Sequence, residues 1–372
     1  MELTTDANAP ALSYCNDRLN IAYINESGSL VTKSSSGNKW SAFGSPNISG
    51  IVGQTLNLAC DGNGNLYLSY ISNSDRKAYV YKSASASNSW TALGSGLGTS
   101  VISAKLKINP KNNAPSIILL GSVNNTANIV RVYDYSNAKW NALTKATMNE
   151  NSTYREVDMA FDPNGNRIVV ANGNTSSDYT IYYYYIASGA TSTASTKNNK
   201  ININAESIQA FYSGEFFYVG FRSRDDDGLP RLVRAQATQS KLTNSNAFTT
   251  SGAEFTAFGH RCFNTFFAVD ENGNPLLAID DAFYARNSQV HVYRFADGAW
   301  AELGENELPY FKNIFGAKHG YYIRGFRPQL AVSSSGDIYL SMRAQEAPSS
   351  AASVLPGTNN GPIVMEYRGD DW

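Results

Sequence analysis

The chain has 372 residues, a formal net charge of −1 at neutral pH, and only 16% charged residues, against roughly 25% in typical globular proteins. Such sparse and balanced charge excludes the concentrated basic surface that nucleic-acid binding requires. No apolar run approaches the ~18 residues of a membrane span, and no segment at the start resembles a signal peptide.

Pairs of alternating apolar runs, separated by a short polar turn, recur along the whole chain. The seven pairs cover residues 11–24, 56–70, 104–120, 157–171, 207–221, 265–279 and 328–342. Several turns contain Asn-Gly or Ser-Gly, which tolerate the positive φ angles of tight hairpins. Each pair therefore predicts two antiparallel strands.

A third apolar run, a polar turn and often a tryptophan follow each pair. The third runs are residues 79–82, 129–133, 179–185, 232–235, 290–295 and 363–367, and the tryptophans are Trp40, Trp90, Trp140, Trp300 and Trp372. The first three tryptophans are 50 residues apart, and Trp300 lies about three such steps further on. A fixed period of this length is typical of repeat architectures. We expect each tryptophan to open a fourth strand.

Four short antiparallel strands that repeat radially form the blades of a β-propeller. The sequence thus predicts an all-β, seven-bladed propeller in a single domain, residues 1–372, with almost no helix. The predicted blades are residues 9–49, 55–100, 103–150, 154–200, 203–252, 262–308 and 327–372. Residues 1–5 should complete the last blade and close the ring, because residues 1–4 placed after Trp372 read W-MELT, close to WAELG at Trp300.

Two segments that lead into tryptophan, SSSGNKW (34–40) and ADGAW (296–300), resemble the Asp-box motif, although neither matches it fully. The 50-residue unit is similar to Asp-box and kelch-type propellers, but the chain lacks the Gly-Gly doublet of kelch blades. The likeness extends to secreted bacterial propellers that repeat D-x-x-G-N and W-x-x-L-G. It implies a propeller that is extracellular, periplasmic or on the cell surface, and it leaves the ligand open.

The three cysteines are interpreted as structural. Cys15 and Cys60 end the first strand of the first two units, where other units have an apolar residue, so we expect small buried side chains. A disulfide between them is not expected, because inner strands of neighbouring blades usually stand more than about 7 Å apart. Cys262 has no obvious mate, and no metal-binding Cys and His spacing is present. No cofactor is expected; calcium at residues 225–228 is the alternative, although a solvated turn fits that segment better.

The longest predicted loops all leave one face of the propeller, around the mouth of the central channel. They are residues 222–231, 252–261, 280–287 and 305–327, on the last three blades. Long loops in a compact domain are usually functional, and these carry clustered arginine, histidine, acidic and tyrosine residues. The predicted ligand-binding residues are Arg222, Arg224, His260, Arg261, Asp281, Tyr321, Arg324 and Arg327.

Three functions are compatible with such a surface. The first is a monomeric binding module for a glycan or a partner protein, which grips its ligand with arginine forks and aromatic faces. The second is a glycoside hydrolase or lyase with paired carboxylates at the same mouth, drawn from Asp280, Asp281, Glu254, Glu305 or residues 225–227. The third is a structural interaction scaffold. Because no nucleophile elbow, phosphate loop or zinc motif is present, the sequence favours binding over catalysis.

Overall fold

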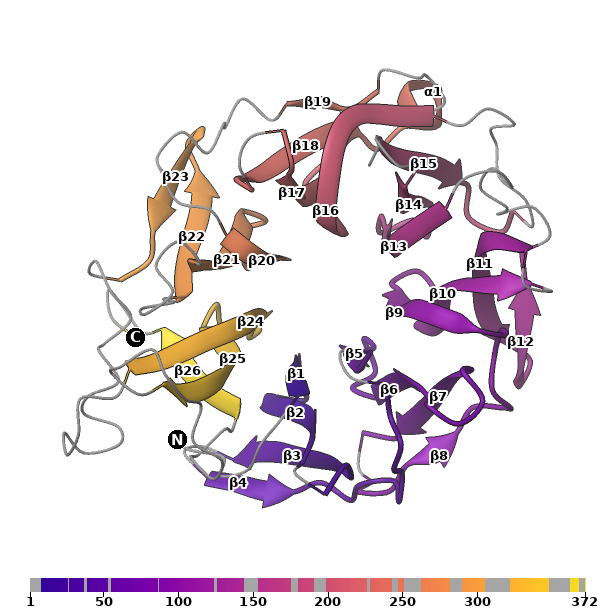
Figure 1. The fold of residues 1–372 in the computed structure, drawn as a ribbon, viewed down its shortest axis with the longest axis vertical. Helices are drawn as coiled ribbons and strands as arrows, with labels where there is room; N and C mark the ends of the chain where they lie inside the picture. Colours follow the sequence, from indigo (N-terminus) through magenta and orange to yellow (C-terminus); the bar gives the residue numbers. More distant parts are fainter. Residues whose placement is uncertain are drawn as a thin grey trace.

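The computed structural model describes residues 8–25, 27–36, 39–52, 55–85, 87–123, 126–143, 153–174, 180–190, 199–225, 228–242, 247–250, 262–281, 290–304, 322–347, 362–367 and 372. The described strands form antiparallel sheets arranged around a central opening, which is the arrangement of a β-propeller (Figure 1). The fold is all-β, as predicted, apart from the four-residue helix α1 (Gln239–Leu242). No helix in the described ranges is long and apolar enough to cross a membrane.

The first three sheets have four strands each, in sequence order. They are β1 (Asn8–Cys15), β2 (Arg18–Ile24), β3 (Leu30–Ser36) and β4 (Lys39–Ala42); β5 (Asn57–Cys60), β6 (Leu66–Ile71), β7 (Ala78–Ser83) and β8 (Thr91–Ala92); and β9 (Val101–Asn109), β10 (Ala114–Val123), β11 (Thr126–Ser136) and β12 (Lys139–Ala142). Each sheet places its first strand at the centre and its last strand at the rim (Figure 1).

The second half of the chain forms three further sheets. A seven-stranded sheet contains β13 (Thr153–Phe161), β14 (Arg167–Asn174), β15 (Thr180–Ile186), β16 (Asn199–Ser213), β17 (Phe216–Ser223), β18 (Pro230–Gln236) and β19 (Thr249–Thr250); the next contains β20 (Cys262–Val269), β21 (Pro275–Asp281), β22 (Val290–Ala296) and β23 (Ala299–Glu302); the last contains β24 (Tyr322–Val332), β25 (Ile338–Ala347) and β26 (Pro362–Tyr367).

The prediction of seven separate blades is not confirmed, because the described strands form six sheets. The seven-stranded sheet occupies the ranges predicted for blades four and five. Its long strand β16 pairs with β15 through residues 199–204 and with β17 through residues 205–213. The strand therefore runs without a break from the rim of one four-stranded group to the centre of the next. Closure of the ring by residues 1–5 falls outside the described residues.

The turns between the first two strands of several sheets share one hydrogen-bonding pattern. In the turn after β5, one carboxylate oxygen of Asp61 accepts from the backbone N–H of Asn63 at 2.9 Å and of Asn65 at 2.8 Å. Gly64 supplies the positive φ of 75° that the turn requires. Asp270 organises the turn after β20 in the same way, and Asp162 accepts from the backbone N–H of Asn166 at 2.8 Å in the turn after β13. The hairpins predicted from Asn-Gly are thus confirmed at these positions.

The tryptophans occupy equivalent positions near the rim. Trp40, Trp140 and Trp300 lie in the outer strands β4, β12 and β23, each as the second residue of its strand. Trp90 directly precedes the outer strand β8. The prediction that a tryptophan opens the fourth strand is confirmed for these four residues.

The indole rings also link consecutive sheets. In three cases an indole N–H donates to a backbone carbonyl of the preceding sheet. The residue that supplies the carbonyl lies three positions after the tryptophan of that preceding sheet. The three pairs are Trp90 to Phe43 at 3.4 Å, Trp140 to Leu93 at 2.6 Å, and Trp372 to Leu303 at 2.8 Å. The 50-residue period therefore reflects a bond between neighbours, which explains why the tryptophans recur at fixed spacing.

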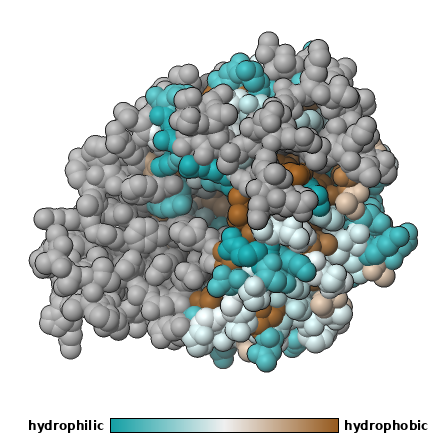
Figure 2. All heavy atoms as spheres, turned by 45° about the vertical axis from the view of Figure 1, so that its right-hand side comes forward, coloured by the Kyte–Doolittle hydropathy of each residue, from teal (hydrophilic) through white to brown (hydrophobic). Residues whose placement is uncertain are grey.

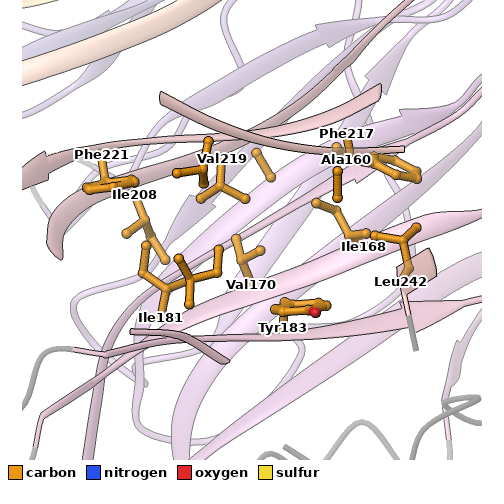
Figure 3. Packing of buried hydrophobic residues seen from close by; sticks show 14 of the residues in the cluster. Ala160, Ile168, Val170, Ile181, Tyr183, Ile208, Phe217, Val219, Phe221 and Leu242 are labelled. Carbon is orange, nitrogen blue, oxygen red and sulfur yellow. The ribbon is translucent and has the colours of Figure 1, made fainter. Parts of the chain in front are cut away.

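Buried apolar clusters fill the spaces between sheets. The largest cluster joins β13–β15 to β16–β18, and Figure 3 shows Ile208, Val219 and Phe221 facing Val170 and Ile181 across the gap. A smaller cluster contains Leu12 and Ile21 of the first sheet together with Ala331 and Val364 of the last. The first and last sheets therefore pack against each other.

The expectation that Cys15 and Cys60 are unlinked is wrong. The two residues form a disulfide between the ends of β1 and β5, with their Cα atoms 5.5 Å apart. Neighbouring inner strands converge at this end of the channel, where the Asn16 side-chain amide also donates to the Gly64 carbonyl at 2.7 Å. Cys262 is buried and forms no disulfide among the described residues; its thiol donates to the Gly228 carbonyl at 3.1 Å.

An ion pair between a buried arginine and a partly buried aspartate joins the third sheet to the seven-stranded sheet. Arg167 of β14 donates from both terminal nitrogens to the two carboxylate oxygens of Asp134 on β11, each at 2.6 Å. Burial opposes the charged form of Asp134, but the guanidinium and the Ser116 hydroxyl outweigh it, so the pKa of Asp134 lies below its usual range.

The lowered pKa predicts an acid-sensitive contribution to stability. Replacing Asp134 with Asn should lower the free energy of unfolding at pH 7 by about 3 kcal/mol, the cost of breaking a buried ion pair. The carboxylate stabilises the fold above its unfolded pKa of about 3.9, and this contribution is lost as the pH falls through the folded pKa. Chemical denaturation at several pH values should therefore show the difference between Asp134→Asn and the wild type shrinking below pH 4. The exposed Asp297→Asn is the control and should change stability little. A difference that persists in acid would contradict the assignment.

Candidate functional site

Seven strand segments face the central opening and are here called the inner strands: β1, β5, β9, β13, residues 205–213 of β16, β20 and β24 (Figure 1). All except β5 contain an irregularity in their pairing near the start of the inner segment. The register shifts fall at residues 8–11, 101–103, 154–156, 206–209, 262–265 and 326–329. A β-bulge bends a strand and redirects side chains. A ring of bulges therefore surrounds one end of the channel, which we call the mouth.

The mouth contains a cavity of about 320 Å³. Its lining comes from six inner strands or the residues just before them: Val52, Thr55, and residues 102–105, 155–157, 207–209, 264–266 and 328–329. Most of these are the bulged segments themselves. The starts of the inner strands meet here. The predicted loops 252–261 and 305–327 lead into two of these starts, so the cavity lies on the face for which the sequence predicted a function.

Polar side chains at the mouth also connect neighbouring inner strands. A carboxylate oxygen of Glu156 accepts from the backbone N–H of Ile208 at 3.0 Å, and Asp158, one step deeper, accepts from Ala210 at 2.9 Å. The Gln209 side chain accepts from the backbone N–H of Phe267 at 2.6 Å. These bonds satisfy inner-strand N–H groups that have no backbone partner on the neighbouring sheet.

Glu206 lies between two arginines at the edge of the mouth. It is opposite Arg222 in the pairing of β16 with β17 and forms an ion pair with it. Arg224 approaches the other carboxylate oxygen at 3.1 Å, and Arg222 also donates to the carbonyl of Cys262 at 3.1 Å. Two guanidinium groups around one carboxylate leave a net positive charge, and the Arg224 side chain is 42% exposed. This cluster can therefore meet an anionic or hydroxyl-bearing ligand from solvent.

The pKa of Glu156 is raised above its usual value. Burial is the main cause, and the nearby negative charge of Glu206 adds to it. The Ile208 N–H and the positive charge of Lys105 act in the opposite direction but do not cancel the effect. Glu156 can therefore hold a proton at a higher pH than an exposed glutamate, which is the property required of a general acid.

The apolar part of the mouth is small. Among the described residues, Ile102 is the one large hydrophobic side chain that is exposed, and it lines the cavity. Figure 2 shows small hydrophobic areas dispersed among hydrophilic and neutral ones on the described part of one face. The cavity lining thus combines one carboxylate, two cations and several amides with apolar side chains from the same strands.

The structure places two of the eight predicted ligand-binding residues. Arg222 is the second-last residue of β17, and Arg224 lies in the turn after it, within the predicted loop of residues 222–231. Arg324 and Arg327 belong to β24, and Asp281 ends β21, but their side chains are not among the described features. His260, Arg261 and Tyr321 lie outside the described residues.

The structure describes residues of two alternative sites that the sequence suggested, the carboxylate Asp280 and the possible calcium site at residues 225–228. Asp280 is buried and accepts hydrogen bonds from the backbone and side-chain amides of Asn264, so it positions a cavity-lining residue. Asp225 accepts from the Asn204 side chain at 2.6 Å. Within the described ranges, no group of three or more His, Cys, Asp or Glu side chains is placed to hold a metal ion; Asp226 and Asp227 are outside those ranges.

Sequence reasoning missed the strand residues of the mouth. Lys105, Arg155, Glu156, Glu206 and Asn264 lie in strands, whereas the sequence pointed to loops. A signal was present: charged residues interrupt the apolar alternation near the start of several inner strands, as in TYREVDMAF of β13.

Comparisons with known proteins support the fold. A comparison with protein families found no match, and neither did a comparison with curated proteins. Among solved structures, a polysaccharide lyase described as an ulvan lyase has a TM-score of 0.58 at 9% identity, covering 94% of this chain and 96% of that one. An α-L-arabinanase from Penicillium chrysogenum has a TM-score of 0.53 at 14% identity, covering 79% and 98%. A prolyl endopeptidase has a TM-score of 0.54 at 11% identity, and this chain, matched over 98%, spans half of it. At such identities the likeness shows a propeller fold that carbohydrate-active enzymes also use.

The raised pKa of Glu156 predicts a pH-dependent effect of its charge. Between the unfolded pKa of about 4.3 and the higher folded pKa, the folded chain binds more protons, so stability falls as the pH rises. Glu156→Gln keeps an oxygen that can accept from Ile208 but cannot ionise. Its melting temperature relative to the wild type should therefore increase from pH 4 to pH 8. The exposed Glu215→Gln serves as the control and should show no such trend. A Glu156→Gln difference that does not change with pH would contradict the interpretation.

Proposed function

We propose that this protein binds a glycan at the channel mouth. The observation that carries the proposal is the cavity of about 320 Å³ built from bulged segments of the inner strands, with polar and charged side chains in its wall. The volume lies at the lower end of the range of about 300–1,000 Å³ typical of ligand pockets. It suits one or two sugar units, such as the end of a longer chain.

The residue types match the chemistry of sugars. A hydroxyl group both donates and accepts, so a sugar site needs donors and acceptors side by side. Lys105 and Arg155 supply donors, Glu156 supplies an acceptor, and Asn264 can supply both. Arg222 and Arg224 extend the donor set at the edge and favour a sugar with a negative charge.

The predicted loop residues belong to the same proposal. His260, Arg261, Asp281, Tyr321, Arg324 and Arg327 occur in segments that adjoin the bulged starts of β20 and β24 or the end of β21. They would extend the binding surface outward from the cavity, with Tyr321 available to stack on a sugar ring. We further propose that the chain acts as a monomer outside the cytoplasm, where polymeric glycans are found.

The structural neighbours support a glycan ligand at the level of the fold. The lyase has been described bound to a -[GlcA(1-4)Rha3S]- segment, and the arabinanase bound to arabinobiose. Propellers host many unrelated functions, so the argument rests on the cavity and not on the neighbours.

A second candidate function is glycoside hydrolysis or elimination at the same mouth. The specific observation in its favour is the raised pKa of Glu156, with Glu206 close enough to contribute to it. Glycosidases use two carboxyl groups in different environments, and here Glu156 is buried whereas Glu206 lies between two arginines. Turnover of a bound glycan, abolished by Glu156→Gln with binding retained, would distinguish this function from simple binding.

Glycan-array screening tests the binding proposal. The wild type should bind at least one glycan class, and Lys105→Ala and the double variant Arg261→Ala/Arg327→Ala should each weaken that binding about tenfold or more, because each loses charge-assisted hydrogen bonds. Lys139→Ala, an exposed lysine on the outer strand β12, is the matched control and should bind as the wild type does. Binding that survives both mouth variants, or no binding by the wild type, would refute the proposal.

Seven blades and closure by the N-terminal residues also remain part of our proposal. The last sheet has three described strands, with β26 at its edge, where three other sheets carry a fourth strand that contains a tryptophan. Residues 1–4 can pair with β26 and supply that strand. In the three indole bonds, the accepting carbonyl lies three residues after the tryptophan of the preceding sheet. If Met1 is counted as the residue after Trp372, the third residue is Leu3. The Leu3 carbonyl would then accept from the Trp40 indole.

Deleting residues 2–5 should lower the melting temperature by several degrees, since it exposes the edge of β26 and weakens the contact between the first and last sheets. Calorimetry on the purified proteins measures this. A length-matched variant with Gly and Ser at residues 2–5 keeps the chain length and backbone, so it should lose less than the deletion. An unchanged melting curve for the deletion would refute the closure.

A further inference from the structure

A second, larger cavity of about 510 Å³ lies between the first two sheets. Its lining comes from the ends of β1 and β2, from β3, and from the turns and strand ends of the second sheet: Cys15, Asn16, Arg18, Asn20, Ser34, Phe43, Gly64, Leu66, Ser83, Ala84, Ser85 and Asn88. Cys15 is the last residue of β1, whereas the bulge of β1 at the channel mouth lies at its start. The two cavities are therefore at opposite ends of the inner strands and share no lining residue.

The walls of this cavity are fixed at both ends. At the centre, the disulfide between Cys15 and Cys60 joins β1 to β5, and Asn16 bonds to the Gly64 carbonyl. Toward the rim, Gly44 approaches the Asn88 carbonyl so closely that any side chain at Gly44 would collide with it. The Trp90 indole also donates to the carbonyl of Phe43. Two sheets held together at the centre and at the rim enclose a preformed space between them.

The lining is polar and contains a single charged residue. Amide groups come from Asn16, Asn20 and Asn88, and hydroxyl groups come from three serines. The buried hydroxyl of Ser34 has no hydrogen-bond partner among the described residues. Arg18 is exposed and forms no ion pair in the described part of the chain, and the lining includes no aspartate or glutamate. An unpaired guanidinium beside neutral amides and hydroxyls favours a ligand that has many hydroxyl groups and one negative charge.

Phe43 adds an apolar surface to this wall. Its ring meets the Trp90 ring edge-on, with centroids 5.8 Å apart and planes at 81°. That contact holds the Phe43 ring in place, and the side chain remains partly exposed at the cavity. A fixed aromatic ring beside polar groups is the combination that binds a sugar ring, through its C–H face and its hydroxyls.

We propose that the space between the first two sheets is a second binding site, for an acidic monosaccharide unit, with Arg18 as the carboxylate partner and Asn88 and Ser85 as hydroxyl partners. The site is separate from the channel mouth, and the proposal does not depend on what the mouth binds.

The test uses D-glucuronate as the probe on the full chain. Titration calorimetry should detect glucuronate binding, while D-glucose, which lacks the charge, and acetate, which lacks the ring, should bind at least about tenfold more weakly, because each loses one half of the recognition. Hydrogen exchange with mass spectrometry should show glucuronate-dependent protection in residues 15–20 and 83–88. Protection confined to other segments, or equal binding of all three probes, would overturn the proposal.

Variants locate the site independently. Arg18→Ala should weaken glucuronate binding about tenfold or more, through loss of the charged hydrogen bonds, and Ala84→Tyr should block the cavity from an exposed position. Lys39→Ala removes an exposed cation from β4 of the same sheet and is the matched control. Wild-type affinity in both Arg18→Ala and Ala84→Tyr would overturn the proposal.

The disulfide provides a further arm of the same experiment. Because Cys15 lines the cavity and is tied to β5, the double variant Cys15→Ser/Cys60→Ser should weaken glucuronate binding and reduce the protection of residues 15–20. Circular dichroism verifies that this variant folds, and Arg18→Ala decides the question if it does not. Unaltered affinity in a folded double variant would show that the disulfide does not shape the site.

Discussion

The structure depends on side chains that bridge neighbouring inner strands. Backbone hydrogen bonds hold together strands that are consecutive in the chain, but neighbouring inner strands, such as β13 and the inner part of β16, are not paired with each other by any backbone ladder among the described residues. Their unpaired N–H groups need acceptors, and Glu156, Asp158 and Gln209 supply them. At the rim, the tryptophan indoles play the corresponding part. The ring is thus held by short polar contacts at its inner and outer circumference, with apolar clusters between.

This constraint explains why the channel mouth is chemically rich. A carboxylate that accepts from a neighbouring backbone must sit at the channel wall, close to other such groups and partly removed from water. Those conditions raise the pKa of Glu156 and place it beside Glu206 and Lys105. The side chains that maintain the ring are therefore the same ones that could act on a ligand. For this reason, a variant such as Glu156→Gln must be assessed for stability and for binding at the same time.

The sequence predicts the parts of the fold that depend on local chemistry. The turns after β5, β13 and β20 are visible as Asp followed by Asn-Gly, because one carboxylate organises each turn. The tryptophans are visible because they occupy equivalent rim positions, and the indoles of Trp90, Trp140 and Trp372 bond to the preceding sheet. The continuity of β16 was missed because the tryptophan signal is absent from this part of the chain, although residues 199–213 contain no Gly or Pro to end the strand. The disulfide was missed because sequence does not reveal where inner strands converge.

The same distinction applies to the candidate sites. Arg222 and Arg224 could be predicted from a charged loop, but their partner Glu206 lies on a strand, and only the pairing of β16 with β17 brings it opposite Arg222. Lys105 and Arg155 line the mouth from strands β9 and β13, where the sequence shows only a charged residue within an apolar alternation and not its position beside the channel.

The cavity between the first two sheets depends even more on contacts between residues that are far apart in the sequence. Its residues look like ordinary turn and strand-end residues: asparagines, serines and glycines. They become a site because a disulfide at the centre and a close backbone contact at Gly44 fix the two sheets at a distance that packing alone does not fill. The contacts that stabilise a propeller between its blades therefore also determine where it can hold ligands.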